Sequence, residues 1–199
     1  MRLNSTSQRL LITTTLWLIG GSSIAKAQTS NADIIRGMSP DKKYGLQISC
    51  SSYPLDEKDI DPSLITAVKL VALPAKTAVM DIGQSYSGSA PELVWSADSN
   101  WFAFSVASGP RVSDTYVYRR LDTGFTELKP EDLRLPIEGD VRNEYVTPIR
   151  WLKPGILLLK DAVIFRAGGE ATYRFAAVFD KKGDKFRITL KKKVGSKAE

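Results

Sequence analysis

The sequence contains no histidine and only one cysteine among its 199 residues. Without histidine, neither a Ser-His-Asp triad nor a metal site built on imidazole can form. One cysteine excludes intrachain disulfides, zinc ribbons and CxxC redox chemistry. The chain also lacks G-x-S-x-G, a phosphate-binding loop, G-x-G-x-x-G and an EF-hand loop. We therefore predict a protein that is not an enzyme, with no catalytic residue, no cofactor and no metal.

The N-terminus has the pattern of a secretory signal over residues 1–27. Arg2 and Arg9 make a positive start, and residues 10–24 form an apolar stretch containing Thr, Ser and Gly. Ala25-Lys26-Ala27 is an A-x-A cleavage site. We expect an exported protein, periplasmic or extracellular, with no membrane span after cleavage. An uncleaved anchor is the alternative.

The formal charge of +6 is unevenly distributed along the chain. Residues 181–199 hold eight basic and two acidic residues, whereas residues 28–180 hold 17 basic and 20 acidic ones. Lys185, Arg187 and Lys191 lie in this basic C-terminal hairpin and are candidates for contact with an anionic surface. Lysines that protect a sheet edge are the alternative. Export makes nucleic acid an unsuitable partner, and we predict none.

Beyond residue 28 the chain is dominated by β patterns. Stretches rich in Val, Ile, Thr and aromatic residues are separated by turn residues such as Asp122-Thr123-Gly124 and Lys181-Lys182-Gly183-Asp184. One short helical start is expected at Lys129–Leu133. No βαβ alternation occurs, which favours antiparallel sheets. The predicted strands cover 43–50, 64–73, 76–82, 92–95, 100–107, 113–120, 124–128, 145–151, 156–165, 171–180 and 184–193.

A repeat recurs at nearly constant spacing. Met38, Trp95 and Trp151 are 57 and 56 positions apart, and each precedes a turn and an apolar strand. The first turn is Ser39-Pro40-Asp41 and the second is Ser96-Ala97-Asp98, whereas the third lacks the Asp. Ser and Asp side chains accept hydrogen bonds from backbone N–H groups ahead of them, so we interpret Asp41 and Asp98 as structural rather than catalytic.

Two of these segments, Trp95-Ser96-Ala97-Asp98-Ser99-Asn100-Trp101-Phe102-Ala103-Phe104 and Ser39-Pro40-Asp41-Lys42-Lys43-Tyr44, resemble the TolB-type, WD-like β-propeller repeat. Its usual form is W-S-P-D-G-K-x-[IL]-A-F. The resemblance implies an all-β, antiparallel, partial or open propeller of about three blades. The spacing exceeds the usual blade length of roughly 40–45 residues, and three blades are too few to close a propeller. A β-sandwich or barrel is the alternative fold.

We predict one β domain at 28–193, with repeats at about 34–82, 92–128 and 145–193, and a frayed tail at 194–199. Trp95, Trp151 and Cys50 are expected in the core. Because Phe102 and Phe104 alternate with Trp101, we expect Trp101 to be exposed and available for recognition. The neighbouring Arg119 and Arg120 could stack with anionic groups.

The resemblance implies an exported protein-interaction scaffold that docks another protein of the envelope or the exterior. The predicted partner-binding residues are Trp101, Arg119, Arg120, Lys185, Arg187 and Lys191. The alternative function is an accessory or ligand-binding β domain of an envelope enzyme system.

Overall fold

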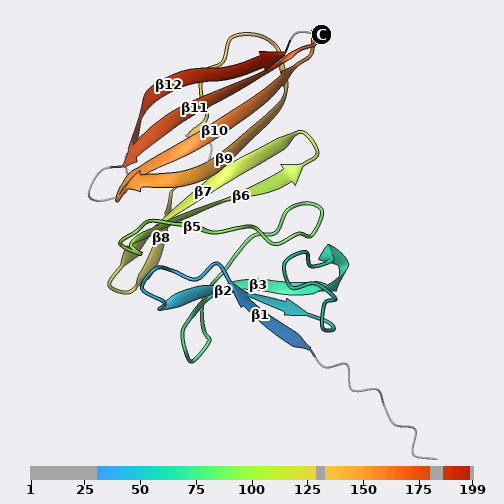
Figure 1. The fold of residues 1–199 in the computed structure, drawn as a ribbon, viewed down its shortest axis with the longest axis vertical. Helices are drawn as coiled ribbons and strands as arrows, with labels where there is room; N and C mark the ends of the chain where they lie inside the picture. Colours follow the sequence, from blue (N-terminus) through green and yellow to red (C-terminus); the bar gives the residue numbers. More distant parts are fainter. Residues whose placement is uncertain (1–30, 129–132, 180–185, 198–199) are drawn as a thin grey trace, which may run out of the picture.

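A computed structural model describes residues 31–128 and 133–179 and the backbone of 186–197. These residues form three successive groups of four strands, which confirms the predicted all-β class (Figure 1). The first group is β1 (Ala32–Arg36), β2 (Tyr44–Cys50), β3 (Ile65–Ala72) and β4 (Thr77–Asp81). The second is β5 (Val94–Trp95), β6 (Trp101–Gly109), β7 (Val112–Leu121) and β8 (Gly124–Leu128). The third is β9 (Val141–Lys153), β10 (Ile156–Phe165), β11 (Glu170–Phe179) and β12 (Phe186–Lys197).

Each predicted strand corresponds to a strand of the structure, with two differences. β1 was not among the predicted strands, because its sequence is short and Asp33 breaks its apolar pattern. The predicted tail at 194–199 is wrong up to Lys197, because β12 continues to that residue. There the register pairs Gly195 with Thr172 and Lys197 with Glu170. The predicted secretory segment at 1–27, most of the helical start at 129–133 and the turn at 181–184 lie outside the described residues.

The strands form two sheets. The first group is a sheet of order β1-β2-β3-β4, and a 3-10 turn, Pro62–Leu64, directly precedes β3 in the connection from β2. The other eight strands form one sheet of order β12-β11-β10-β9-β7-β6-β5, with β8 also paired to β7. The expectation of purely antiparallel pairing is wrong at one place, since β7 and β9 are parallel. The pairing joins Val112 to Glu144 and Ser113 to Tyr145.

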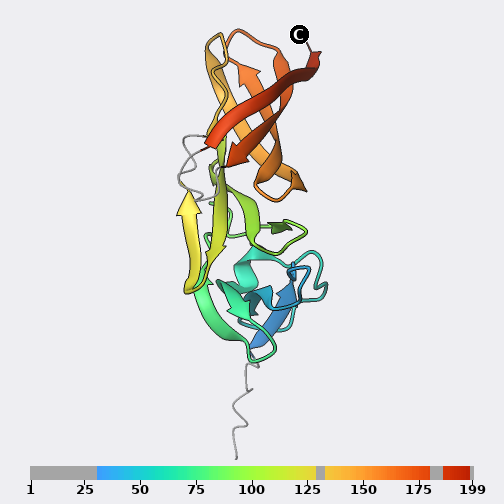
Figure 2. The ribbon, with the colours of Figure 1, turned by 90° about the vertical axis from the view of Figure 1, so that its left-hand side faces the viewer.

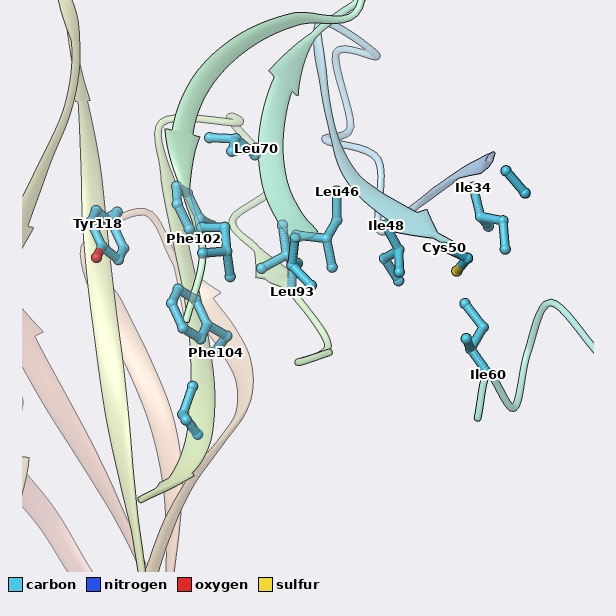
Figure 3. Packing of buried hydrophobic residues seen from close by; sticks show 14 residues of the cluster. Ile34, Leu46, Ile48, Cys50, Ile60, Leu70, Leu93, Phe102, Phe104 and Tyr118 are labelled. Atoms are coloured by element: carbon cyan, nitrogen blue, oxygen red, sulfur yellow. The ribbon is translucent and has the colours of Figure 1, made fainter. Parts of the chain in front are cut away.

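The first core lies between the first and second groups. Leu46, Ile48 and Leu70 are fully buried against Phe102 and Phe104 of β6 (Figure 3). Cys50 is also fully buried in this core, as predicted, and burial raises the pKa of its thiol. Because alternate residues of a strand point to opposite faces, only half of β6 can serve this core.

The second core lies on the other face of β6. Trp101 and Ala103 pack there with Leu157, Leu159 and Phe175 of the third group. The second group is therefore covered on both faces, and the three groups follow one another along the long axis of the molecule (Figures 1 and 2). The two sheets do not close into a barrel, which leaves an open propeller-like array or a sandwich. No helix of sufficient length and apolar character to cross a bilayer occurs in the described residues.

Candidate partner-binding cleft

The first two repeat turns have the same geometry. In the first, Ser39 Oγ donates to Asp41 Oδ1 at 2.6 Å and accepts the N–H of Tyr44 at 3.0 Å. In the second, Ser96 Oγ donates to Asp98 Oδ1, and the N–H of Trp101 donates to Ser96 Oγ at 3.0 Å. The structural interpretation of both aspartates is therefore confirmed.

These hydrogen bonds also set the charge state of the two carboxyl groups. Burial alone would raise the pKa of Asp41, but hydrogen bonds from Ser39, from the Lys43 N–H and from Arg120 lower it below its ordinary value. Burial likewise opposes the ionisation of Asp98, and hydrogen bonds from Ser96 and Asn100 lower its pKa overall. Both turns thus carry a negative charge at neutral pH.

One backbone feature is shared by all three repeats. Lys42, Ser99 and Gly155 each stand four residues after the bulky residue that opens the repeat, and they have φ of 58°, 59° and 75°. This left-handed conformation favours glycine, yet only the third repeat has it. Ser99 has a second role, since its Oγ accepts the N–H of Asp41 at 2.9 Å and so ties the second turn to the first.

A guanidinium occupies the junction between the first and second groups. Arg120 lies over the ring of Tyr44, 4.8 Å from its centroid, and donates to Asp41 Oδ2 at 3.2 Å. Phe125 meets the same tyrosine ring edge-on, with a centroid separation of 5.1 Å. This arrangement fills the junction and neutralises the charge of the first turn.

The corresponding junction between the second and third groups is open. A cleft of about 480 Å³ lies there, lined by Asp98, Asn100, Trp101, Arg119, Arg120, Pro154, Gly155 and Phe179. We call it the Arg119 cleft. Arg119 and Arg120 are neighbours on β7, so Arg119 points to the face of the second core and Arg120 to the face of the first.

Arg119 is held over an aromatic floor. Its guanidinium carbon lies 5.4 Å from the centroid of the Trp101 ring. Trp101 in turn stacks on Phe179 at 5.5 Å and meets Trp151 at 5.6 Å. Within the described part of the chain, no carboxylate pairs with Arg119. A half-buried cation on an aromatic surface is suited to a carboxylate or phosphate group of a ligand.

The prediction that Trp101 is exposed is wrong, because its side chain retains only 5% exposure. Phe102 and Phe104 do occupy one buried face, as expected, but the third group covers the opposite face as well. Trp101 nevertheless lines the cleft together with both predicted arginines. Phe179, Pro154 and Gly155 also line the cleft and were not predicted as site residues. For Pro154 and Gly155, the available signal was the alignment of the third repeat turn with the first two turns.

The other predicted contact residues are not part of this cleft as described. Lys185 lies outside the described residues, whereas Arg187 and Lys191 belong to β12, of which the backbone is described. In the described residues, no group of three or more cysteine, aspartate or glutamate side chains is arranged to hold a metal ion.

Comparison with known proteins leaves the family open. No protein-family model matches the chain, and no curated protein does. One solved structure that resembles it is described as "Structural and Mechanistic Analysis of Two Prolyl Endopeptidases: Role of Inter-Domain Dynamics in Catalysis and Specificity". The similarity covers 79% of this chain and 28% of that chain, with 13% identity and a TM-score of 0.35. This similarity is too low to assign a function.

Proposed function

We propose that this chain is an exported, non-enzymatic interaction protein built from TolB-like repeats, and that it binds an acidic segment of a partner protein in the Arg119 cleft. The export signal and the repeat motif support the first part. The position of Arg119 over Trp101 is the observation that carries the second.

The chemistry of the cleft is that of a protein-binding hot spot. Such sites are enriched in Trp, Tyr and Arg and are small compared with the whole interface. Here a tryptophan and a phenylalanine form the floor, and a guanidinium with five donors lies above it. A partner carboxylate would replace water around Arg119 and form charge-assisted hydrogen bonds, which are stronger than those between neutral groups.

The two junctions differ in whether their arginine already has a carboxylate partner, and this difference supports a binding role for Arg119. At the first junction, Arg120 already has Asp41 as its partner. At the second, the cleft retains space beside Arg119, and the nearby third turn has Pro154 where the second has Asp98. A ligand carboxylate at Arg119 would therefore take the place that Asp41 takes beside Arg120.

The test is capture of partners from envelope extracts with the tagged protein and two variants. Arg119→Glu reverses the charge in the cleft, whereas Arg111→Glu makes the same change at an exposed turn outside it. We expect a set of proteins recovered with the wild type and with Arg111→Glu to be lost with Arg119→Glu. Recovery of the same proteins with all three baits would refute the proposed site. Circular dichroism of the variants verifies that they are folded.

A further inference from the structure

The third group has a second surface with its own chemistry. In β10, Leu157 and Leu159 point into the second core, so Leu158 and Lys160 lie on the opposite face. On that face the register places Lys160 directly opposite Arg174 of β11, and both side chains are exposed. We call this side of β9, β10 and β11 the basic face.

Like charges directly opposite each other on an antiparallel pair destabilise a sheet, because their Cβ atoms are only about 4.5–5.5 Å apart. The pair Lys160–Arg174 is therefore not explained by folding. Its charge is not balanced by acids on the same face. The described residues there include four cations, Arg150, Lys153, Lys160 and Arg174, and one acid, Glu170, which lies four residue pairs from Lys160–Arg174 along the strands.

The cations border an apolar patch of β10 on two sides. Arg150 stands opposite Leu158, and Lys153 stands opposite Ile156. Both apolar side chains are half-buried. The backbone register places Lys192 of β12 at the position opposite Arg174.

We propose that the basic face binds the surface of an anionic lipid bilayer. Basic residues near a membrane are attracted to anionic headgroups, and each contributes separately, so lysine serves as well as arginine. A protein interface would be expected to have aromatic anchors and little lysine. Among the described residues of this face, the one aromatic side chain is Tyr145, whose hydroxyl donates to the carbonyl of Pro110 at 2.9 Å.

The place of the basic face in the molecule is consistent with this partner. The third group forms one end of the elongated molecule, with the first group at the other end (Figures 1 and 2). The Arg119 cleft lies on the opposite side of the third group of strands, beside Gly155 and Phe179. A bilayer bound at the basic face therefore does not compete for the residues of the cleft.

The experiment measures sedimentation of the full chain with vesicles of phosphatidylglycerol and phosphatidylethanolamine, and with vesicles of phosphatidylcholine alone. The neutral vesicles report any contribution of the apolar N-terminal stretch. Lys160→Glu/Arg174→Glu replaces one like-charge pair by another, and Lys58→Glu/Lys76→Glu is the control. The control makes the same change in net charge at exposed positions of the first group.

We expect the wild type and the control to bind the anionic vesicles and the Lys160→Glu/Arg174→Glu variant to bind at least tenfold more weakly. Binding should also weaken as salt is raised, because salt screens charges. Equal binding of all three proteins to anionic vesicles would overturn the proposal. Binding of the wild type to poly-glutamate but not to vesicles would also overturn it, in favour of an acidic protein. Thermal unfolding of each variant establishes that it is folded.

Discussion

The indole Nε1 of Trp95 donates a hydrogen bond to the carbonyl oxygen of Gly37 at 2.7 Å. Trp151 makes the same bond one repeat later, donating to the carbonyl of Val94 at 2.9 Å. Gly37 and Val94 directly precede Met38 and Trp95, so donor and acceptor hold the same repeat positions in both cases. The tryptophans therefore fix each group of strands to the one before it.

Replacing either tryptophan should weaken the corresponding junction. Trp95→Phe and Trp151→Phe each remove the donor and part of the ring volume. We expect each to lower the free energy of unfolding by about 1–3 kcal/mol, since a lost hydrogen bond and a partly emptied site both contribute. Urea denaturation measures the change. Tyr53→Phe, in an exposed loop, is the control and should leave the midpoint nearly unchanged.

The left-handed turn position predicts that the same change to glycine has different effects on stability in the first two repeats. Lys42 is exposed with φ of 58°, and Lys42→Gly should stabilise the protein by up to about 1 kcal/mol by relieving backbone strain. Ser99 has φ of 59° but also accepts the N–H of Asp41, so Ser99→Gly loses a hydrogen bond while relieving the same strain. We expect Ser99→Gly to be less stable than Lys42→Gly by about 1 kcal/mol. Equal effects in thermal unfolding would show that the bond between the turns contributes nothing.

The turn carboxylates predict acid sensitivity. The pKa values of Asp41 and Asp98 are lower in the folded protein than in the unfolded chain, because the turn hydrogen bonds outweigh burial. The unfolded chain therefore binds protons more readily. The stability they contribute is complete above the unfolded pKa of about 3.9 and is lost as the pH falls through the lower folded values. The double variant Asp41→Asn/Asp98→Asn should flatten this part of the pH dependence.

Denaturation in urea at several pH values between 6 and 3 tests the acid effect. Asp122→Asn, in the exposed turn between β7 and β8, is the matched control and should keep the wild-type profile. The prediction fails if the double variant loses as much stability on acidification as the control does.

The sequence carried most of the information about local structure. The alternation of apolar and polar residues and the turn residues located the strands, and the spacing of Met38, Trp95 and Trp151 located the three groups. The sequence also indicates that both faces of β6 are buried, although the prediction for Trp101 did not take this into account. Trp101 to Phe104 is a continuous apolar run, and such runs are typical of strands covered on both sides.

The contacts between groups could not be predicted in the same way. The parallel pairing of β7 with β9 involves two residues on each strand and depends on how the third group packs. The cleft combines Arg119, Gly155 and Phe179, which are separated by dozens of residues. Local patterns determine which face of a strand a residue occupies, but they do not determine which distant strand covers that face.

A charged contact between residues far apart in the sequence stabilises the pairing of β7 with β9. Arg134 donates to Asp114 of β7 and to Glu144 of β9, next to the parallel pairing of these strands. All three side chains are at least two-thirds buried. Arg134→Ala leaves two carboxylates close together without their cation, and we expect a loss of about 2 kcal/mol. Arg166→Ala breaks the exposed pair with Asp140 and should cost less than about 1 kcal/mol. Urea denaturation of both variants decides the point, and a larger loss for Arg166→Ala would mean that the Arg134 contact does not hold β7 and β9 together.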